Sequence, residues 1–172
     1  MVTTSNEIVD AVLARHASDL GDSAPTYRNH VLRSLNYQEL LQGRDVTSEA
    51  ALAWAVHDLG IWTAGTFDYL DPSAALAERY ADELGVTQPE RSVQMVQQHH
   101  KLRAHADEEI ETFRKADLID VSRGLIRFGI SRSEVRAVVR ALPYCGFHRF
   151  LAKGLTAHAV RHPTKPAPMM RW

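Results

Sequence analysis

The chain has a single cysteine, Cys145, among its 172 residues. One thiol excludes an internal disulfide and a zinc cage built from cysteines. Any bound metal ion must therefore be held by histidine, aspartate or glutamate side chains. The sequence contains nine histidines, so nitrogen ligands are not scarce.

The sequence also lacks a charge bias and a long apolar run. Its formal net charge is -1 and its pI is about 6.8, without the basic excess usual in nucleic-acid-binding proteins. No window reaches the roughly 18 consecutive apolar residues of a membrane span, and the start "MVTTSNE" does not resemble a signal peptide. We expect a cytoplasmic protein that acts on a small molecule, without nucleic-acid or membrane partners. A homodimer remains open.

Helical periodicity extends over nearly the whole chain, and 45% of the residues are hydrophobic. This pattern predicts one all-α domain over residues 1–162, a compact bundle of about eight helices, followed by an irregular, proline-rich tail over 163–172. Met169, Met170 and Trp172 in this tail could dock on a surface or on a partner chain. The expected helices cover approximately 6–21, 22–43, 48–60, 71–85, 87–101, 107–123, 131–143 and 146–161.

Two helix starts carry the sequence pattern of a capping box, in which a Ser or Thr is followed three residues later by Glu. One is Thr87 with Glu90 and the other is Ser131 with Glu134. Both predict the first residue of a helix.

Several ionisable residues fall where the helical pattern predicts burial. The stretch "WAVHDLG" places His57 and Asp58 at the end of an apolar, alanine-rich helix. Asp117 lies on a stripe with Ile110, Phe113 and Val121, and His30 shares a helix face with aromatic residues. A buried carboxylate needs a shifted pKa, a salt bridge or a metal ion.

One divalent cation would satisfy these groups together. Two imidazoles (His30, His57) and two carboxylates (Asp58, Asp117) are suitable ligands for Zn, Mn, Fe, Co or Ni, and they leave positions open for water and substrate. The alternative is a structural cluster of ion pairs that holds no metal.

This ordered set resembles the HD-domain superfamily of metal-dependent phosphohydrolases. The resemblance covers about residues 27–123 and is carried by "YRNH", "VHDLG" and "ADLID". In the family's "ADxxD" segment the first aspartate is the ligand, which favours Asp117 over Asp120. The resemblance implies an HD fold, a metal-activated water and hydrolysis of a small phosphate ester or a nucleotide. Asp58 is the candidate catalytic residue, as a metal ligand that also accepts a proton from the water.

The sequence departs from the family at two points. Many phosphate-cleaving members have a lysine shortly after the dipeptide, where this chain has Ile61 and Trp62. No histidine occurs between His57 and His99, so the histidines usual for a second ion are incomplete and we expect one metal ion.

The remaining candidates would contact the substrate. They are His99, preferred by similarity to the family's "HH" segment, with His100, Lys101 and Arg33; Arg28 and Arg103 are further basic groups that could meet a phosphate. Two alternatives stay open. One is a hydratase similar to cyanamide hydratase, which adds water to a small nitrile. The other is a degenerate HD domain that binds a ligand without catalysis.

Overall fold

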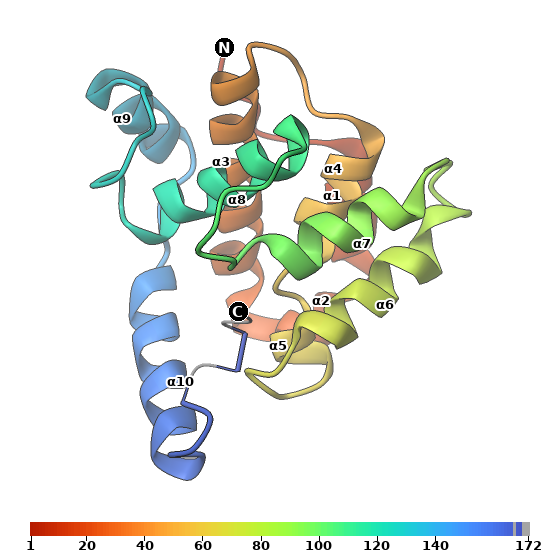
Figure 1. The fold of residues 1–172 in the computed structure, drawn as a ribbon, viewed down its shortest axis with the longest axis vertical. Helices are drawn as coiled ribbons and strands as arrows, with labels where there is room; N and C mark the ends of the chain where they lie inside the picture. Colours follow the sequence, from red (N-terminus) through yellow and green to blue (C-terminus); the bar gives the residue numbers. More distant parts are fainter. Residues whose placement is uncertain (167, 170–172) are drawn as a thin grey trace.

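Helix α3 (Ala24–Gln42) crosses the middle of the molecule and the other helices lie around it (Figure 1). The computed structural model describes residues 1–166, 168 and 169, and no strand occurs among them. Eight of the described α-helices have nine residues or more, which confirms the predicted all-α bundle. None of the helices in the described part is both long and apolar enough to cross a membrane. Besides α3, the elements are α1 (Glu7–Arg15), α2 (Ala17–Leu20), η1 (Gly21–Ser23), α4 (Ser48–Val56), α5 (Gly60–Thr63), α6 (Leu70–Ala81), α7 (Pro89–Gln98), α8 (Glu108–Val121), α9 (Arg132–Ala141) and α10 (Phe147–Arg161).

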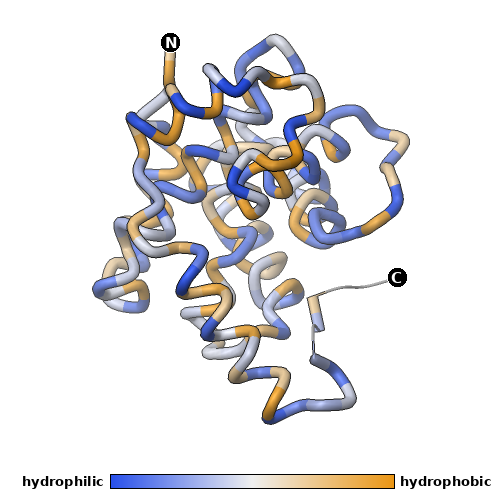
Figure 2. The backbone as a smooth tube through the Cα atoms, turned by 90° about the vertical axis from the view of Figure 1, so that its left-hand side faces the viewer, coloured by the Kyte–Doolittle hydropathy of each residue, from blue (hydrophilic) through white to orange (hydrophobic). Residues whose placement is uncertain are grey.

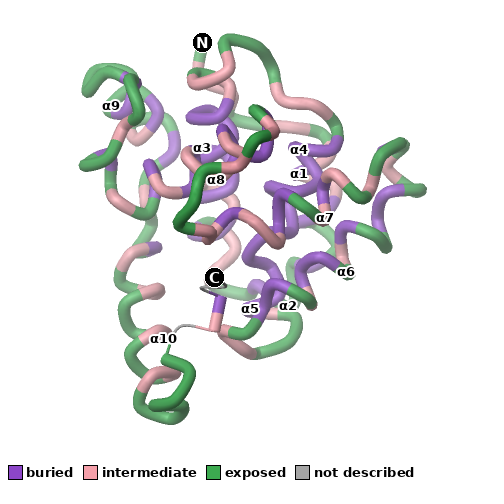
Figure 3. Tube along the Cα trace, viewed as in Figure 1, coloured by how far each residue is buried: buried purple, intermediate pink, exposed green. Residues whose placement is uncertain are grey.

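The core forms where α3 and α4 meet α1, α7 and α8. Helix α4 is apolar on all sides, and every residue from Glu49 to Val56 is buried, as expected for a helix at the centre of a bundle (Figure 3). Elsewhere in the chain, hydrophobic and hydrophilic stretches alternate along the backbone (Figure 2). Trp54 of α4 and Phe113 of α8 stack with ring centroids 3.7 Å apart. This aromatic contact joins the helix that ends at His57 to the helix that carries Asp117.

Two predicted helices are interrupted. The helix expected over 6–21 breaks at His16, which separates α1 from α2. The helix expected over 48–60 ends at Val56, so His57 is its C-cap and Asp58 lies in the turn before α5. Gly60 allows this turn to approach α6, because an added Cβ would lie 2.7 Å from the carbonyl oxygen of Tyr69.

The two predicted capping boxes have different outcomes. The box of Ser131 and Glu134 is confirmed at the start of α9, with both reciprocal hydrogen bonds present. The box of Thr87 and Glu90 is wrong. Helix α7 follows Gln88 without a side-chain cap, and the Thr87 hydroxyl donates instead to Glu49 Oε1 at 3.4 Å. A distant carboxylate has replaced the local partner.

Helix α10 and the tail form a separate, thinner part of the structure. The helix extends away from the bundle at the lower left of Figure 1, and only Phe147 among its 15 residues is buried. Met169 of the tail is 6% exposed and packs with Ile61, Tyr69 and Leu70. Met170 and Trp172, which we also expected to dock, lie outside the described residues.

Candidate metal centre

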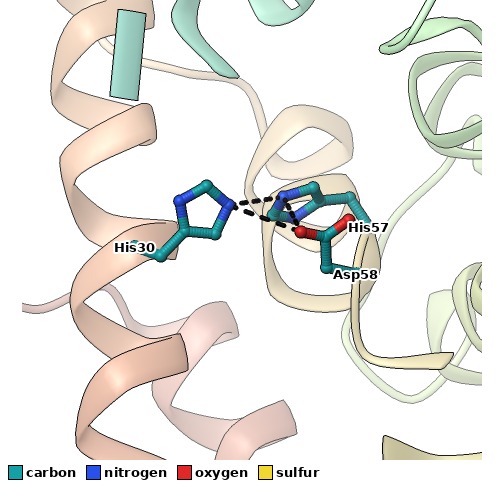
Figure 4. A group of neighbouring side chains, drawn as sticks. All are labelled: His30, His57 and Asp58. Atoms are coloured by element: carbon teal, nitrogen blue, oxygen red, sulfur yellow. Dashed lines mark hydrogen bonds and ion pairs between the residues drawn. The ribbon is translucent and has the colours of Figure 1, made fainter. Parts of the chain in front are cut away.

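The four predicted ligands come together from three parts of the bundle. Helix α3 provides His30, the end of α4 provides His57 and Asp58, and α8 provides Asp117 (Figure 4 shows the first three). His30 Nε2 lies 3.0 Å from His57 Nε2 and 3.6 Å from both Asp58 Oδ2 and Asp117 Oδ1. His57 Nε2 lies 3.5 Å from Asp58 Oδ2 and 4.0 Å from Asp117 Oδ1. All four residues are at most 5% exposed.

The hydrogen bonds of the histidines orient their Nε2 lone pairs toward one another. His57 Nδ1 lies 2.9 Å from the carbonyl oxygen of Trp54, which can only accept, so Nδ1 carries the proton and Nε2 is an acceptor in the neutral ring. His30 Nδ1 is held in the same way by the Asp120 carboxylate at 2.7 Å. Two nitrogen acceptors 3.0 Å apart require a proton or a cation between them. This is the arrangement of donor atoms that a divalent transition metal requires.

The ionisation of the cluster follows from burial and from its neighbours. Burial lowers the pKa of His57 to about 3, so this ring is neutral at physiological pH. Burial also opposes the charged form of His30, but hydrogen bonds to Asp120 and Asp58 outweigh it and raise its pKa to about 9. Thus without a metal ion the proton between the two rings belongs to His30.

Burial opposes the ionisation of both carboxylates, but their net pKa shifts have opposite directions. Burial opposes ionisation of Asp58, but the histidines His57, His30 and His99 around it hold its pKa well below the usual range. Burial raises the pKa of Asp117 to about 6, against the attraction of His99 and His30. Asp58 is therefore the stronger acid of the pair, and a cation beside both groups would favour the charged form of Asp117 as well.

Asp120 orients His30, a role that the sequence did not reveal. It is fully buried, accepts from His30 Nδ1, and also accepts two hydrogen bonds from Arg33, at 2.6 Å (Nε to Oδ1) and 2.8 Å (Nη2 to Oδ2). The sequence feature that could have identified Asp120 is its spacing, since Asp117 and Asp120 are three residues apart and share a face of α8. Val121, which we placed on that buried stripe, is 37% exposed. The buried face of α8 turns toward Asp120 instead.

The prediction that Arg33 contacts the substrate is wrong. Arg33 is fully buried, and besides Asp120 it donates to the carbonyl oxygens of Leu142 and Pro143 at the end of α9. The two other arginines also lie elsewhere: Arg28 pairs with Asp10, and Arg103 lines a different hollow. The guanidinium of Arg33, which we expected to bind a phosphate, instead neutralises the buried Asp120 carboxylate.

His99 and His100 both face the cluster. His99 is 3% exposed, its Nδ1 donates to the carbonyl oxygen of Val96, and its Nε2 lies 3.5 Å from Asp58 Oδ1. Among the described residues neither of these two buried atoms has a hydrogen-bond partner. His100 Nδ1 lies 3.9 Å from Asp117 Oδ2, and its Nε2 bonds the Tyr69 hydroxyl at 2.7 Å.

The potential ligand atoms form two groups that share Asp58. One consists of His30, His57 and Asp58, and the other of Asp58, His99 and His100; in each the atoms lie within 4.8 Å of one another. Either group could hold a metal ion. The expectation of a single ion stays a prediction.

A pocket of about 360 Å³ opens over these residues. Its polar lining comes from Asp58, Asp117, Tyr69, His99, His100, Lys101 and Arg114. Arg114, which we did not predict, is engaged by Glu111 at 2.8 and 2.9 Å. Lys101 has no carboxylate within 4.0 Å among the described residues, so its charge is available to a ligand. Two larger hollows, of about 670 and 660 Å³, include none of the four ligands.

Comparison of the chain with protein-family models, with curated proteins and with solved structures finds no match. The interpretation of this site therefore depends on its residues and their geometry.

Proposed function

We propose that this chain is a metal-dependent phosphohydrolase of the HD type that hydrolyses a small phosphate monoester. His30, His57, Asp58 and Asp117 would hold the ion. The observation that carries the proposal is the convergence of two imidazole nitrogens and two carboxylates from three helix segments, with the two carboxylates lining a pocket. An ion-pair cluster with a purely structural role would not need an open pocket above it.

A divalent ion held by these four residues would lower the pKa of a bound water to about 7 and would polarise the bond under attack. The chain's own residues would supply the remaining functions. Asp58 Oδ1 has no hydrogen-bond partner among the described residues and can accept a proton from the attacking water. Lys101 can bind a phosphate oxygen as a point charge. The water oxygen bonds to phosphorus, the bond from phosphorus to the alcohol oxygen breaks, and the two water protons end on the alcohol and on the phosphate.

The test is metal analysis of the purified protein, followed by phosphate release from a panel of monoesters with added Mn²⁺, Co²⁺, Ni²⁺ or Zn²⁺. We expect stoichiometric metal and turnover. Asp58→Asn, which keeps the size of the side chain, should abolish turnover. Protein that neither retains nor binds any of these ions would overturn the proposal and favour a ligand-binding module.

Hydration of a small nitrile is the second candidate, favoured by a specific observation. The walls of the pocket are largely apolar, and Ile61 and Trp62 occupy the positions after the dipeptide where phosphate-cleaving relatives of this type would have a lysine. In this reaction the water oxygen bonds to the nitrile carbon and both protons end on nitrogen. Turnover of cyanamide without turnover of any phosphate ester would replace the first candidate by this one.

A further inference from the structure

The pocket has two chemically different halves. The polar half contains Lys101 and two of the candidate ligands, Asp58 and Asp117. The other half, which we call the apolar wall, is built from six side chains of four separate chain segments: Phe67, Leu118, Val121, Leu151, Leu155 and Met169. The remaining apolar lining residue, Leu102, is 64% exposed. A reacting group held at the polar half would direct the rest of a substrate against this wall.

The apolar wall is a packed structure. Phe67, Leu155 and Met169 belong to a hydrophobic cluster with Tyr69, separate from the main core. Helix α10 is attached there by stacking of Phe150 on Trp62, with ring centroids 4.9 Å apart and planes inclined by 7°. Gly154 provides a close contact, because an added Cβ would lie 2.2 Å from Phe67 Cζ. These contacts hold the leucines of α10 opposite the metal ligands.

The apolar wall offers no side-chain hydrogen bond to a substrate. None of its six described members carries a polar side-chain atom. The hydroxyls of a ribose and the edge of a base would lose their hydrogen bonds to water here without replacement, which is costly for buried polar groups. A hydrocarbon would gain from the same burial. The wall therefore disfavours nucleotides and sugar phosphates.

We propose that the substrate is a phosphate monoester of an apolar alcohol, with an alkyl or aryl group that packs on Phe67, Leu151, Leu155 and Met169. The proposal rests on the proposed function and specifies its substrate class. The pocket volume of about 360 Å³ is adequate, since a cavity of ~150 Å³ accommodates benzene. Lys101, at the polar half, would bind the phosphate end.

The experiment measures kcat/KM for methyl, butyl and hexyl phosphate, with phenyl phosphate as the aryl representative and adenosine monophosphate as the polar comparison. Each buried methylene should raise kcat/KM by about fourfold until the pocket is filled. The kcat/KM for phenyl phosphate should exceed that for methyl phosphate, and the kcat/KM for adenosine monophosphate should be lower than that for phenyl phosphate. Equal values for methyl and hexyl phosphate, or preference for the nucleotide, would overturn the inference.

A matched pair of variants on α10 locates the effect. Leu155→Asn places an amide on the apolar wall, whereas Val160→Asn makes the same kind of change on the same helix at a side chain that is 76% exposed. Leu155→Asn should lower kcat/KM for hexyl phosphate by about tenfold relative to kcat/KM for methyl phosphate. Val160→Asn should change neither. An equal loss for both esters would contradict the role of the wall.

Binding of phosphonates separates failure of this inference from failure of the proposed function. Hexylphosphonate and methylphosphonate are not hydrolysed, and their affinities for the Mn²⁺-loaded protein can be measured by calorimetry. If no ester is hydrolysed but hexylphosphonate binds at least about tenfold more tightly, the pocket assignment stands and the hydrolase proposal falls. If esters are hydrolysed and the two phosphonates bind equally, the hydrolase proposal stands and this inference falls.

Discussion

Two of the candidate metal ligands, Asp58 and Asp117, line the same pocket as the apolar wall, but the ligand cluster and the wall are held in very different ways. His30 and His57 are fully buried, and each ring is oriented by a hydrogen bond on its other nitrogen. Helix α10, which carries two leucines of the wall, has one buried residue, and its other residues are intermediate or exposed (Figure 3). The proposed metal site would thus lie in the buried part of the bundle, and the surface that would select the substrate would lie at its edge. Substitutions on the wall should change substrate specificity at little cost in stability. Substitutions among the buried candidate ligands should cost more stability.

The largest effect is expected from removal of a ligand at the buried side. His57→Ala should reduce bound metal from stoichiometric to negligible and abolish activity, because one of only two imidazole nitrogens in the four-ligand set is lost. Elemental analysis would measure the bound metal and phosphate release would measure the activity. Circular dichroism would show whether the helix content is retained. His162→Ala, at an exposed position after α10, is the control and should retain metal and activity. Full metal content in His57→Ala would refute the ligand assignment.

The next effect concerns the support beneath the ligands. Arg33→Ala leaves the fully buried Asp120 carboxylate without its arginine partner, and loss of one member of a buried pair costs about 3–5 kcal/mol. Urea unfolding would measure this loss. Arg28→Ala is the matched control on the same helix, because the pair of Arg28 and Asp10 is partly exposed and such a pair contributes about 0–1 kcal/mol. Equal destabilisation by the two variants would mean that the buried pair contributes no more to the free energy of unfolding than the partly exposed pair.

A comparison of the two aspartates of α8 sharpens the distinction between binding and orientation. Asp120→Asn weakens the hold on His30 Nδ1 and should lower metal affinity by roughly 10–100-fold. Asp117→Asn removes a proposed ligand and should lower it further, because the Asp117 carboxylate faces His30 Nε2. Competition with a metallochromic chelator would rank the variants. The reverse order would make Asp120 the ligand.

The smallest effect is expected at the edge of the pocket. Hydrogen bonds from Arg114 lower the pKa of Glu111 from 4.5 to about 2 in the folded protein. A carboxyl group whose pKa is lowered by folding stabilises the fold above its unfolded pKa, so this contribution is lost as the pH falls from about 4.5 to about 2. Glu111→Gln should cost at most about 1 kcal/mol at pH 7, since the pair is partly solvated. The difference from the unsubstituted protein should shrink on acidification, and a difference independent of pH would exclude the ion pair as its cause.

Prediction from the sequence succeeded where one stretch of chain carries the whole signal. The capping box of Ser131 and Glu134 spans four residues, so its geometry needs no distant partner. It failed at Thr87, where Glu49 of α4 competes for the hydroxyl. Arg33 was misassigned for the same reason, because its partner Asp120 lies 87 residues away in the chain. Nothing local to Arg33 distinguishes a guanidinium that binds phosphate from one that neutralises a buried aspartate.

The amino-acid order by itself determined the helices and the burial of His30, His57, Asp58 and Asp117, because helical period and apolar pattern act over a few turns. Only the tertiary structure decided that Asp120 orients His30, that His99 faces Asp58, and that Met169 and the leucines of α10 form the wall of the pocket. These contacts depend on which helices pack together and at what rotation. The packing depends on the free energy of the whole core, which no single segment of the sequence determines.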